Sequence, residues 1–341
     1  MDFFTKVEIS TAKTAISYQS RLAFFGSCFA DHISALFASK KFKVLSNPFG
    51  TVYNPLSIER TIQNIADRKI FEESDVFKDE RCDGLWHCWD AHSSFSAKTK
   101  EECIEKLNTA NAKALHFLQQ ADVVFITIGS AFVYSLNGKV VANCHRQDQR
   151  MFERKLISVD EAAQAIKRIV HGIRKIKCDK EILRLRTPSS AQDDTQNLTQ
   201  DSVPHIIFTV SPIRHLGDGA HGNNLSKATV LLAINNALEK IAAEYCPSYE
   251  IVMDELRDYR FYDSDMIHLS KTAEEIIFER MLETYCDNTT RENIAKVEKF
   301  LKMENHRIQD ENSPATQELK KKLAVQAKEL EKHIPGFIFS E

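Results

Sequence analysis

Short apolar runs alternate with longer amphipathic segments along this chain, and that alternation restricts the possible folds more than any other feature. The most apolar run, Val123–Ile128, is typical of a strand buried on both faces of a sheet. Similar runs predict four further strands, at Arg21–Phe25, Lys43–Leu45, Ile206–Val210 and Glu250–Met253. Because strands that alternate with helices form parallel sheets, we expect a three-layer α/β/α fold around a five-stranded parallel sheet.

The segments between these runs have the spacing of helices. Ile33, Leu36 and Phe37 recur on one helical face soon after the first strand, and Pro55 suits the first turn of a second helix. The same spacing predicts further helices over residues 99–120, 158–176, 225–245 and 270–285.

Two segments depart from the alternation. Residues 187–204 are polar and lack aromatic side chains, which predicts a mobile surface loop. After residue 287 the chain is charged and helical, with few side chains suited to a core. We therefore expect an α/β domain over residues 1–287 and a C-terminal helical extension over residues 288–341.

Composition excludes several classes of protein. The 341 residues are 43% hydrophobic and 27% charged, with a net charge of -3, which is typical of a globular protein and gives no electrostatic basis for binding nucleic acid or a membrane. No signal peptide or membrane span is evident, so we expect a cytoplasmic protein. The eight cysteines contain no CxxC pair, and we expect neither a disulfide framework nor a metal or other cofactor. The oligomeric state is left open.

The ends of the predicted strands carry the residues best suited to chemistry, because ligands bind at the carboxyl edge of such sheets. Ser27 and Cys28 follow the first strand, where a helix begins. Asp265 and His268 stand three residues apart before the last helix of the sheet domain. An aspartate there can orient the imidazole through one ring nitrogen while the other accepts a nucleophile's proton.

The block GSCFA at residues 26–30, together with the later segments NCHR, SPIRH and DMIHLS, resembles the bacterial GSCFA family. The resemblance runs from about residue 21 to residue 286. That family is grouped with the SGNH (GDSL-like) hydrolases, which have a flavodoxin-like fold. The resemblance implies an esterase or acyltransferase that forms a covalent acyl-enzyme on a small-molecule or carbohydrate-type (glycan) ester.

The resemblance also implies roles for the strand-end residues. Aligning GSCF with the superfamily's GDSL block puts Cys28 at the position of the serine nucleophile. A thiol at a helix N-terminus near a histidine is expected to have a lowered pKa. Ser27 is the alternative nucleophile, because most of the superfamily uses a hydroxyl, and a third alternative is that neither attacks. The superfamily's D-x-x-H block corresponds to Asp265 and His268, with His268 as the base and Asp265 as its partner.

The oxyanion hole departs from the superfamily pattern. Gly50 corresponds to the glycine of the second block, and Gly129 begins the third block. Ala131 stands where the superfamily's G-x-N-D has its asparagine. Loss of such a donor costs about 10²–10³ in rate unless another group replaces it. Asn143 or Ser130 are the candidates to do so.

Other polar and aromatic side chains are candidates for contacting substrate. An arginine could bind a carboxylate or a sugar oxygen through its guanidinium, and two tryptophans could form a sugar platform. The alternatives are a polar network that braces the loops and ordinary packing. In HGNNLSK (residues 221–227), Asn223 or Asn224 is expected to cap a helix. The substrate-contact candidates are His145, Arg146, Arg214, His215, Trp86 and Trp89.

Two other functions compete with a covalent esterase. The twelve histidines suggest a metal-dependent hydrolase, but the chain lacks the HExxH and CxxC patterns of common metal sites. The missing oxyanion asparagine suggests instead a non-catalytic binding or scaffold protein with a degenerate site.

Overall fold

A five-stranded parallel sheet forms the centre of the protein. The computed structural model describes residues 5–10, 12, 15–81, 83–185, 203–304 and 314–339. The strands lie in the order β2-β1-β5-β9-β10, which is the 2-1-3-4-5 order of flavodoxin-like sheets and confirms the predicted fold class. The strands are β1 (Arg21–Gly26), β2 (Lys43–Ser46), β5 (Val123–Ile128), β9 (His205–Val210) and β10 (Glu244–Tyr245).

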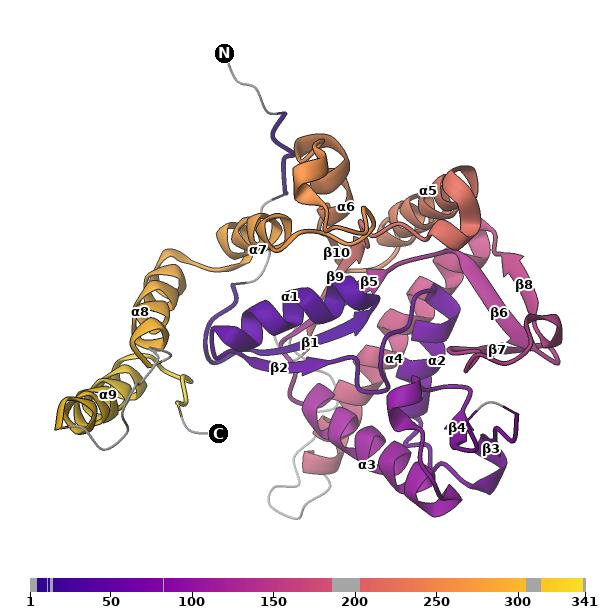
Figure 1. Cartoon of the computed structure of the whole chain (residues 1–341), viewed down its shortest axis with the longest axis horizontal. Coiled ribbons are helices and arrows are strands. Elements are labelled where there is room, and N and C mark those ends of the chain that lie inside the picture. Colours follow the sequence, from indigo (N-terminus) through magenta and orange to yellow (C-terminus); the bar gives the residue numbers. More distant parts are fainter. Residues whose placement is uncertain are drawn as a thin grey trace.

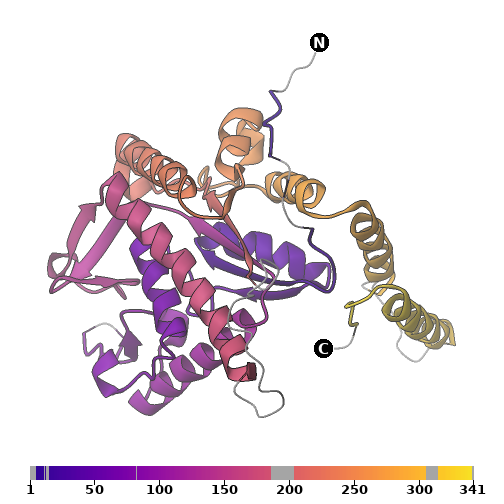
Figure 2. The ribbon, with the colours of Figure 1, turned by 180° about the vertical axis from the view of Figure 1, so that it is seen from behind.

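Helices cover both faces of this sheet (Figures 1 and 2). Side chains alternate along β1: Leu22 and Phe24 pack in one core, and Ala23 and Phe25 pack in the other. The core that contains Leu22 and Phe24 is covered by α1 (Cys28–Ser39) and α7 (Lys271–Tyr285). The other core is covered by α2 (Pro55–Ala66), α3 (Lys100–Leu118), α4 (Val159–Leu185) and α5 (Gly219–Leu238).

The predicted fifth strand is wrong in position. Residues 250–253 lie in a short helical segment that comprises α6 (Ser248–Glu250) and a π-helical turn, Ile251–Glu255. Ile251 and Val252 are buried, as in a strand, but the N–H of Ile251 donates to Pro247 O at 3.0 Å, which closes a helical turn. The fifth strand, β10, has two residues and lies within the segment 225–245 that was predicted as helix.

A small antiparallel sheet extends beyond the parallel one. It contains β6 (Phe132–Leu136), β7 (Lys139–Val141) and β8 (Glu153–Leu156). The predicted hairpin turn at Asn137-Gly138 is confirmed, with positive φ angles of 51° and 76°. A second hairpin joins β3 (Val76–Lys78) to β4 (Trp86–Cys88).

The C-terminal helices α8 (Asn288–Glu304) and α9 (Pro314–His333) lie at the end of the molecule opposite the antiparallel sheet (Figure 1). The segment after α9 returns to the sheet domain, where the Phe337 ring meets Tyr18 edge-on at 5.6 Å. Nearly all of the loop predicted at 187–204 lies outside the described residues.

Candidate functional site

The turn from β1 into α1 requires a glycine. Gly26 has a φ of +128°, and a Cβ atom there would lie 1.9 Å from the carbonyl oxygen of Thr127 on β5. The turn therefore brings the two strands closer than any side chain permits. Ser27 is the N-cap of α1, and Cys28 is its first residue, at the carboxyl edge of the sheet.

A hydrogen-bond network holds this turn. The Asp31 carboxylate on α1 accepts hydrogen bonds from Ser46 Oγ at 2.7 Å and Asn47 Nδ2 at 2.9 Å. Asn47 Oδ1 in turn accepts the backbone N–H of Gly26 at 2.8 Å. The end of β2 thus fixes the position of the helix that carries Cys28.

Cys28 and Ser27 line a cavity of about 330 Å³ at the carboxyl edge of the sheet. The turn after β1, the loops after β5, β7 and β9, the segment before α2, and the small sheet all contribute to its wall. The side chains and backbone that line it include Ser27, Cys28, Tyr53, Asn54, Gly129, Ser130, Phe132, Tyr134, Asn143, Cys144, Arg154, Ser211, Arg214, His215 and Asp218.

The two candidate nucleophiles differ in their surroundings. Ser27 is 1% exposed, and its hydroxyl has no hydrogen-bond partner among the described residues. Cys28 is half-buried, and burial raises the pKa of its thiol, although the backbone N–H of Phe29 and the charge of Lys227 lower it. The prediction that the thiol has a lowered pKa is therefore wrong, because burial raises this pKa by more than the N–H groups at the start of α1 lower it.

A histidine and an aspartate face each other in the same cavity. His215 Nδ1 lies 3.2 Å from Asp218 Oδ2, and Arg154 pairs with the other oxygen of that buried carboxylate. Burial, together with the charges of Arg154 and Lys227, lowers the pKa of His215. These influences favour the neutral imidazole, which is the form that accepts a proton.

Sequence reasoning placed His215 among the substrate contacts but missed Asp218 and Arg154. Asp218 could have been found from its spacing, because His215 and Asp218 form an H-x-x-D pattern, the reverse of D-x-x-H. Arg154 comes from β8, in a separate sheet, and no local pattern places it at the cavity.

Asp265 and His268 form the pair that their spacing predicts, with His268 Nδ1 2.6 Å from Asp265 Oδ2. Neither residue lines the cavity that contains Cys28. His268 instead lines an open groove of about 890 Å³, together with His32 on α1 and Glu274 on α7. His32 lies one helical turn after Cys28 and pairs with Glu274.

Most of the predicted oxyanion donors are occupied. The backbone N–H groups of Gly129 and Ser130 both donate to the carbonyl oxygen of Tyr53, at 2.7 and 2.9 Å. Gly50 donates to Asn47 at 2.7 Å, packs against His92, and does not line the cavity.

Among the predicted oxyanion donors, Asn143 keeps a side-chain N–H group available for a hydrogen bond. Its Oδ1 accepts the N–H of His145 at 2.8 Å, and its Nδ2 has no acceptor among the described residues. A second amide, that of Asn54, also lines the cavity, and its Oδ1 accepts the N–H of Ser57 at the start of α2. Two asparagine side chains therefore line the same cavity as Cys28.

The remaining substrate-contact candidates divide between cavity and core. Arg214 lines the cavity, and the described residues provide no partner for its guanidinium. His145 is buried and donates from Nε2 to Cys88 O at 2.7 Å, and its pKa is lowered to about 4 by burial. The Trp89 ring stacks on Phe77 at 3.7 Å. None of His145, Arg146, Trp86 and Trp89 lines the cavity.

Two further features lie apart from this cavity. Within the described residues, ligand atoms of Asp79, Asp83 and His87 lie within 4.8 Å of one another at the β3–β4 hairpin.

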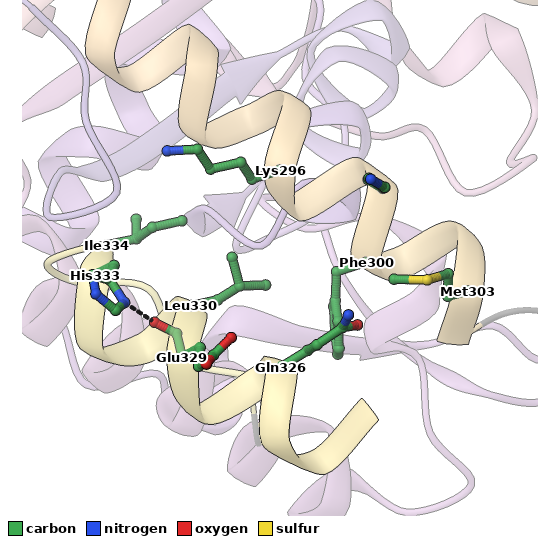
Figure 3. A pocket seen from close by; sticks show the side chains of 9 residues that line it. Lys296, Phe300, Met303, Gln326, Glu329, Leu330, His333 and Ile334 are labelled. Atoms are coloured by element: carbon green, nitrogen blue, oxygen red, sulfur yellow. Dashed lines mark hydrogen bonds between the residues drawn. The ribbon is translucent and has the colours of Figure 1, made fainter. Parts of the chain in front are cut away.

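Figure 3 shows a second cavity, of about 360 Å³, between α8 and α9. Its wall combines apolar side chains such as Phe300 and Leu330 with charged ones, and it contains none of the predicted site residues.

The comparisons with known proteins place the chain in a family. None of the helices in the described part of the chain is both long and apolar enough to cross a membrane. No curated protein matched the chain. The model of the GSCFA family matches residues 21–187 and 179–281, which include all five strands of the parallel sheet and every residue that lines the cavity. The chain therefore belongs to the GSCFA family.

Proposed function

We propose that this protein is a covalent hydrolase or acyltransferase of the SGNH type, which transfers the acyl group of a small or carbohydrate-type ester through Cys28. One observation carries the proposal: Cys28, the first residue of α1, lines the same cavity as the His215–Asp218 pair. A nucleophile, a base with its partner and amide donors in one cavity are the parts that acyl transfer requires.

In this mechanism His215 accepts the thiol proton as Cys28 Sγ attacks the ester carbonyl. The tetrahedral oxyanion is stabilised by the amides of Asn143 and Asn54, and the alcohol leaves with the proton from His215. Water, or an acceptor alcohol, then attacks the thioester and releases the acyl group. Asp218 holds the imidazole, and Arg214 is suited to an anionic or oxygen-rich part of the substrate.

Cys28 is preferred to Ser27 because its side chain is less enclosed and because the charge of Lys227 lowers the pKa of its thiol, against the larger effect of burial. The pair Asp265–His268 remains the alternative source of the base. It is correctly formed, but it lines the groove beside His32 rather than the cavity. A change in the loop before α7 would be needed to bring His268 to Cys28.

The test is intact-mass labelling of the full chain with activated acyl esters and a fluorophosphonate. We expect one acyl adduct, lost in Cys28→Ala and kept in Ser27→Ala. His215→Ala should slow acylation by about 10²-fold or more, as removal of a general base does, whereas His268→Ala should not. Loss only in His268→Ala would assign the base to Asp265–His268. No adduct on any variant would favour a non-catalytic binding protein.

A further inference from the structure

Three side chains of α5 reach the loops that form the cavity. Asn223, Ser226 and Lys227 stand at positions i, i+3 and i+4, so they share one helical face, and each is at most 5% exposed. Asn223 Oδ1 accepts the N–H of His215 at 3.1 Å, and Ser226 Oγ accepts the N–H of Ala131 at 2.7 Å. The segment HGNNLSK is therefore a brace for the loops after β5 and β9 rather than a cap of its own helix.

Lys227 makes the most unusual contacts of the three. Its Nζ donates to Gly129 O at 2.7 Å and to Ser211 O at 2.6 Å, and both of these residues line the cavity. The side chain is 1% exposed, and no carboxylate among the described residues pairs with it. A cation thus lies directly behind the cavity wall without a counter-ion.

A buried ammonium group without an anion is costly, and two carbonyl oxygens solvate it only in part. Burial lowers the pKa of Lys227 to about 7, while the Cys28 thiolate acts in the opposite direction. Lys227 reciprocally lowers the pKa of the Cys28 thiol, against the effect of burial. Gly129, whose carbonyl oxygen accepts from Lys227, packs against the neighbour of Cys28: a Cβ on Gly129 would lie 3.3 Å from the Cβ of Ser27. Lys227 therefore lies behind the part of the cavity wall that carries Cys28.

Other ionisable groups surround the same thiol. Asp31, on the same helix, raises the pKa of Cys28, but its carboxylate is held by Ser46 and Asn47. Arg154 is paired with Asp218, and Lys227, rather than Arg154 or Arg214, is the cation that lowers the pKa of the thiol. The remaining ionisable side chains that line the cavity are Tyr53, Tyr134, Cys144, Arg214 and His215.

We propose that Lys227 is a positioning residue for the Cys28 nucleophile: its ammonium, held behind the cavity wall by two carbonyl oxygens, stabilises the thiolate. This inference rests on the proposed role of Cys28 and adds to it a charge that offsets part of the effect of burial on the thiol. Between the pKa of the ammonium and that of the thiol, the pair holds one proton, and its transfer from sulfur to nitrogen gives the ammonium–thiolate form that can attack.

The test measures the rate of carboxamidomethylation of Cys28 by iodoacetamide, from about pH 6 to about pH 11, by peptide mass spectrometry on the full chain. The thiolate forms the C–S bond as iodide leaves, so the rate follows ionisation. In Lys227→Met and Lys227→Gln we expect the midpoint to rise by about one pH unit, and the rate near neutral pH to fall about tenfold. Lys227→Arg should restore most of the loss.

Two features of the chain make this test specific. Cys144 lines the same cavity, but burial alone shifts its pKa, so its profile should not change in any Lys227 variant. Gln retains a donor for the carbonyl oxygens, so a purely structural role predicts a normal profile in Lys227→Gln. The fully enclosed Cys246 should stay unreactive as long as the chain is folded.

An unchanged Cys28 midpoint in folded Lys227→Met and Lys227→Gln would overturn the inference. Because the measurement uses no substrate, it separates this inference from the proposed function. If the Cys28 midpoint depends on Lys227 but the protein forms no acyl adduct, the interaction of Lys227 with Cys28 is supported and the proposed acyl-transfer function is not. If an acyl adduct forms but the Cys28 midpoint does not depend on Lys227, the proposed function is supported and the inference about Lys227 is overturned.

Discussion

The residues of the GSCFA block divide clearly between architecture and chemistry. Gly26 permits the close approach of β1 to β5, and Phe29 and Ala30 are buried in the core beneath α1. Ser27 caps the helix by its backbone position, without a side-chain cap bond. Cys28 is half-buried at the cavity wall, whereas the Ser27 side chain is enclosed, and this difference is the basis for proposing Cys28 as the nucleophile.

Replacement of Gly26 by alanine should destabilise the fold severely. The new Cβ would meet the Thr127 carbonyl at 1.9 Å, in a backbone conformation that side chains rarely adopt, and we expect a loss of at least about 3 kcal/mol in the free energy of unfolding. Gly84→Ala is the matched control, because Gly84 also has a positive φ but open space around it, and should lose only about 1 kcal/mol. Equal losses in urea unfolding would contradict this account.

The buried imidazole of His145 should make stability depend on pH. Its pKa is about 4 in the folded protein and about 6.5 when unfolded, so the unfolded chain binds more protons between these values. Its contribution is present above pH 6.5 and is lost as pH falls toward 4, by up to about 3 kcal/mol.

His145→Asn tests this dependence. Asparagine tolerates the positive φ of 48° at this position and does not titrate. The variant should lose less stability than the wild type between pH 7 and pH 5 in denaturant titrations, whatever its stability at pH 7. Parallel curves for the two proteins would show that His145 does not titrate as proposed.

At the scale of elements, the sequence predicts buried strands well and short edge strands poorly. The predicted starts and ends of β1, β2, β5 and β9 lie within one residue of those observed, because each is an apolar run between polar segments. β10 has two residues and is defined by its pairing with Ile207 and Phe208 of β9, which no local pattern can reveal. An apolar run as short as Ile251–Met253 suits a buried helical turn equally well.

The candidate site follows the same division. Cys28 and His215 could be placed at one edge of the sheet because each follows a predicted strand. Arg154 and Lys227 could not, because their side chains reach the site from a strand of another sheet and from a helix face. The spacing of Asp265 and His268 predicted their pairing correctly. Spacing along the chain does not reveal whether such a pair lines the cavity that contains Cys28 or the groove beside His32.

The brace on α5 gives a prediction at this scale. Ser226→Ala removes the acceptor of the buried Ala131 N–H and should cost about 1–3 kcal/mol in the free energy of unfolding. It should also slow acylation, since the loop after β5 forms part of the cavity wall. Thr229→Ala, on the same helix with only a bond to its own backbone turn, should be nearly neutral in both assays. A neutral Ser226→Ala would mean that the loop holds its shape without α5.

Over the whole molecule, the C-terminal helices are tied to the sheet domain at two places. Lys40, at the end of α1, pairs with Glu298 on α8 at 2.6 Å. The chain then returns after α9, where Gly336 has a φ of +86° and a Cβ would lie 2.7 Å from the backbone of Gln19. Ile334 and Phe337 belong to the same core as α1 and α7, so the extension completes the layer that supports Cys28.

Substitutions in this returning segment should therefore affect the stability of the sheet domain. Phe337 is 3% exposed, and its ring meets Tyr18, which itself stacks on Phe42 at 4.5 Å. Phe337→Ala should lower the free energy of unfolding by about 3 kcal/mol, the usual cost of removing a buried aromatic ring. The adjacent Ile338 is 49% exposed, and Ile338→Ala is the matched control, with an expected loss below about 1 kcal/mol. If the extension were an independent module, Phe337→Ala would leave the unfolding of the sheet domain unchanged, whereas a single cooperative transition at lower denaturant concentration shows that the returning segment and the sheet fold together.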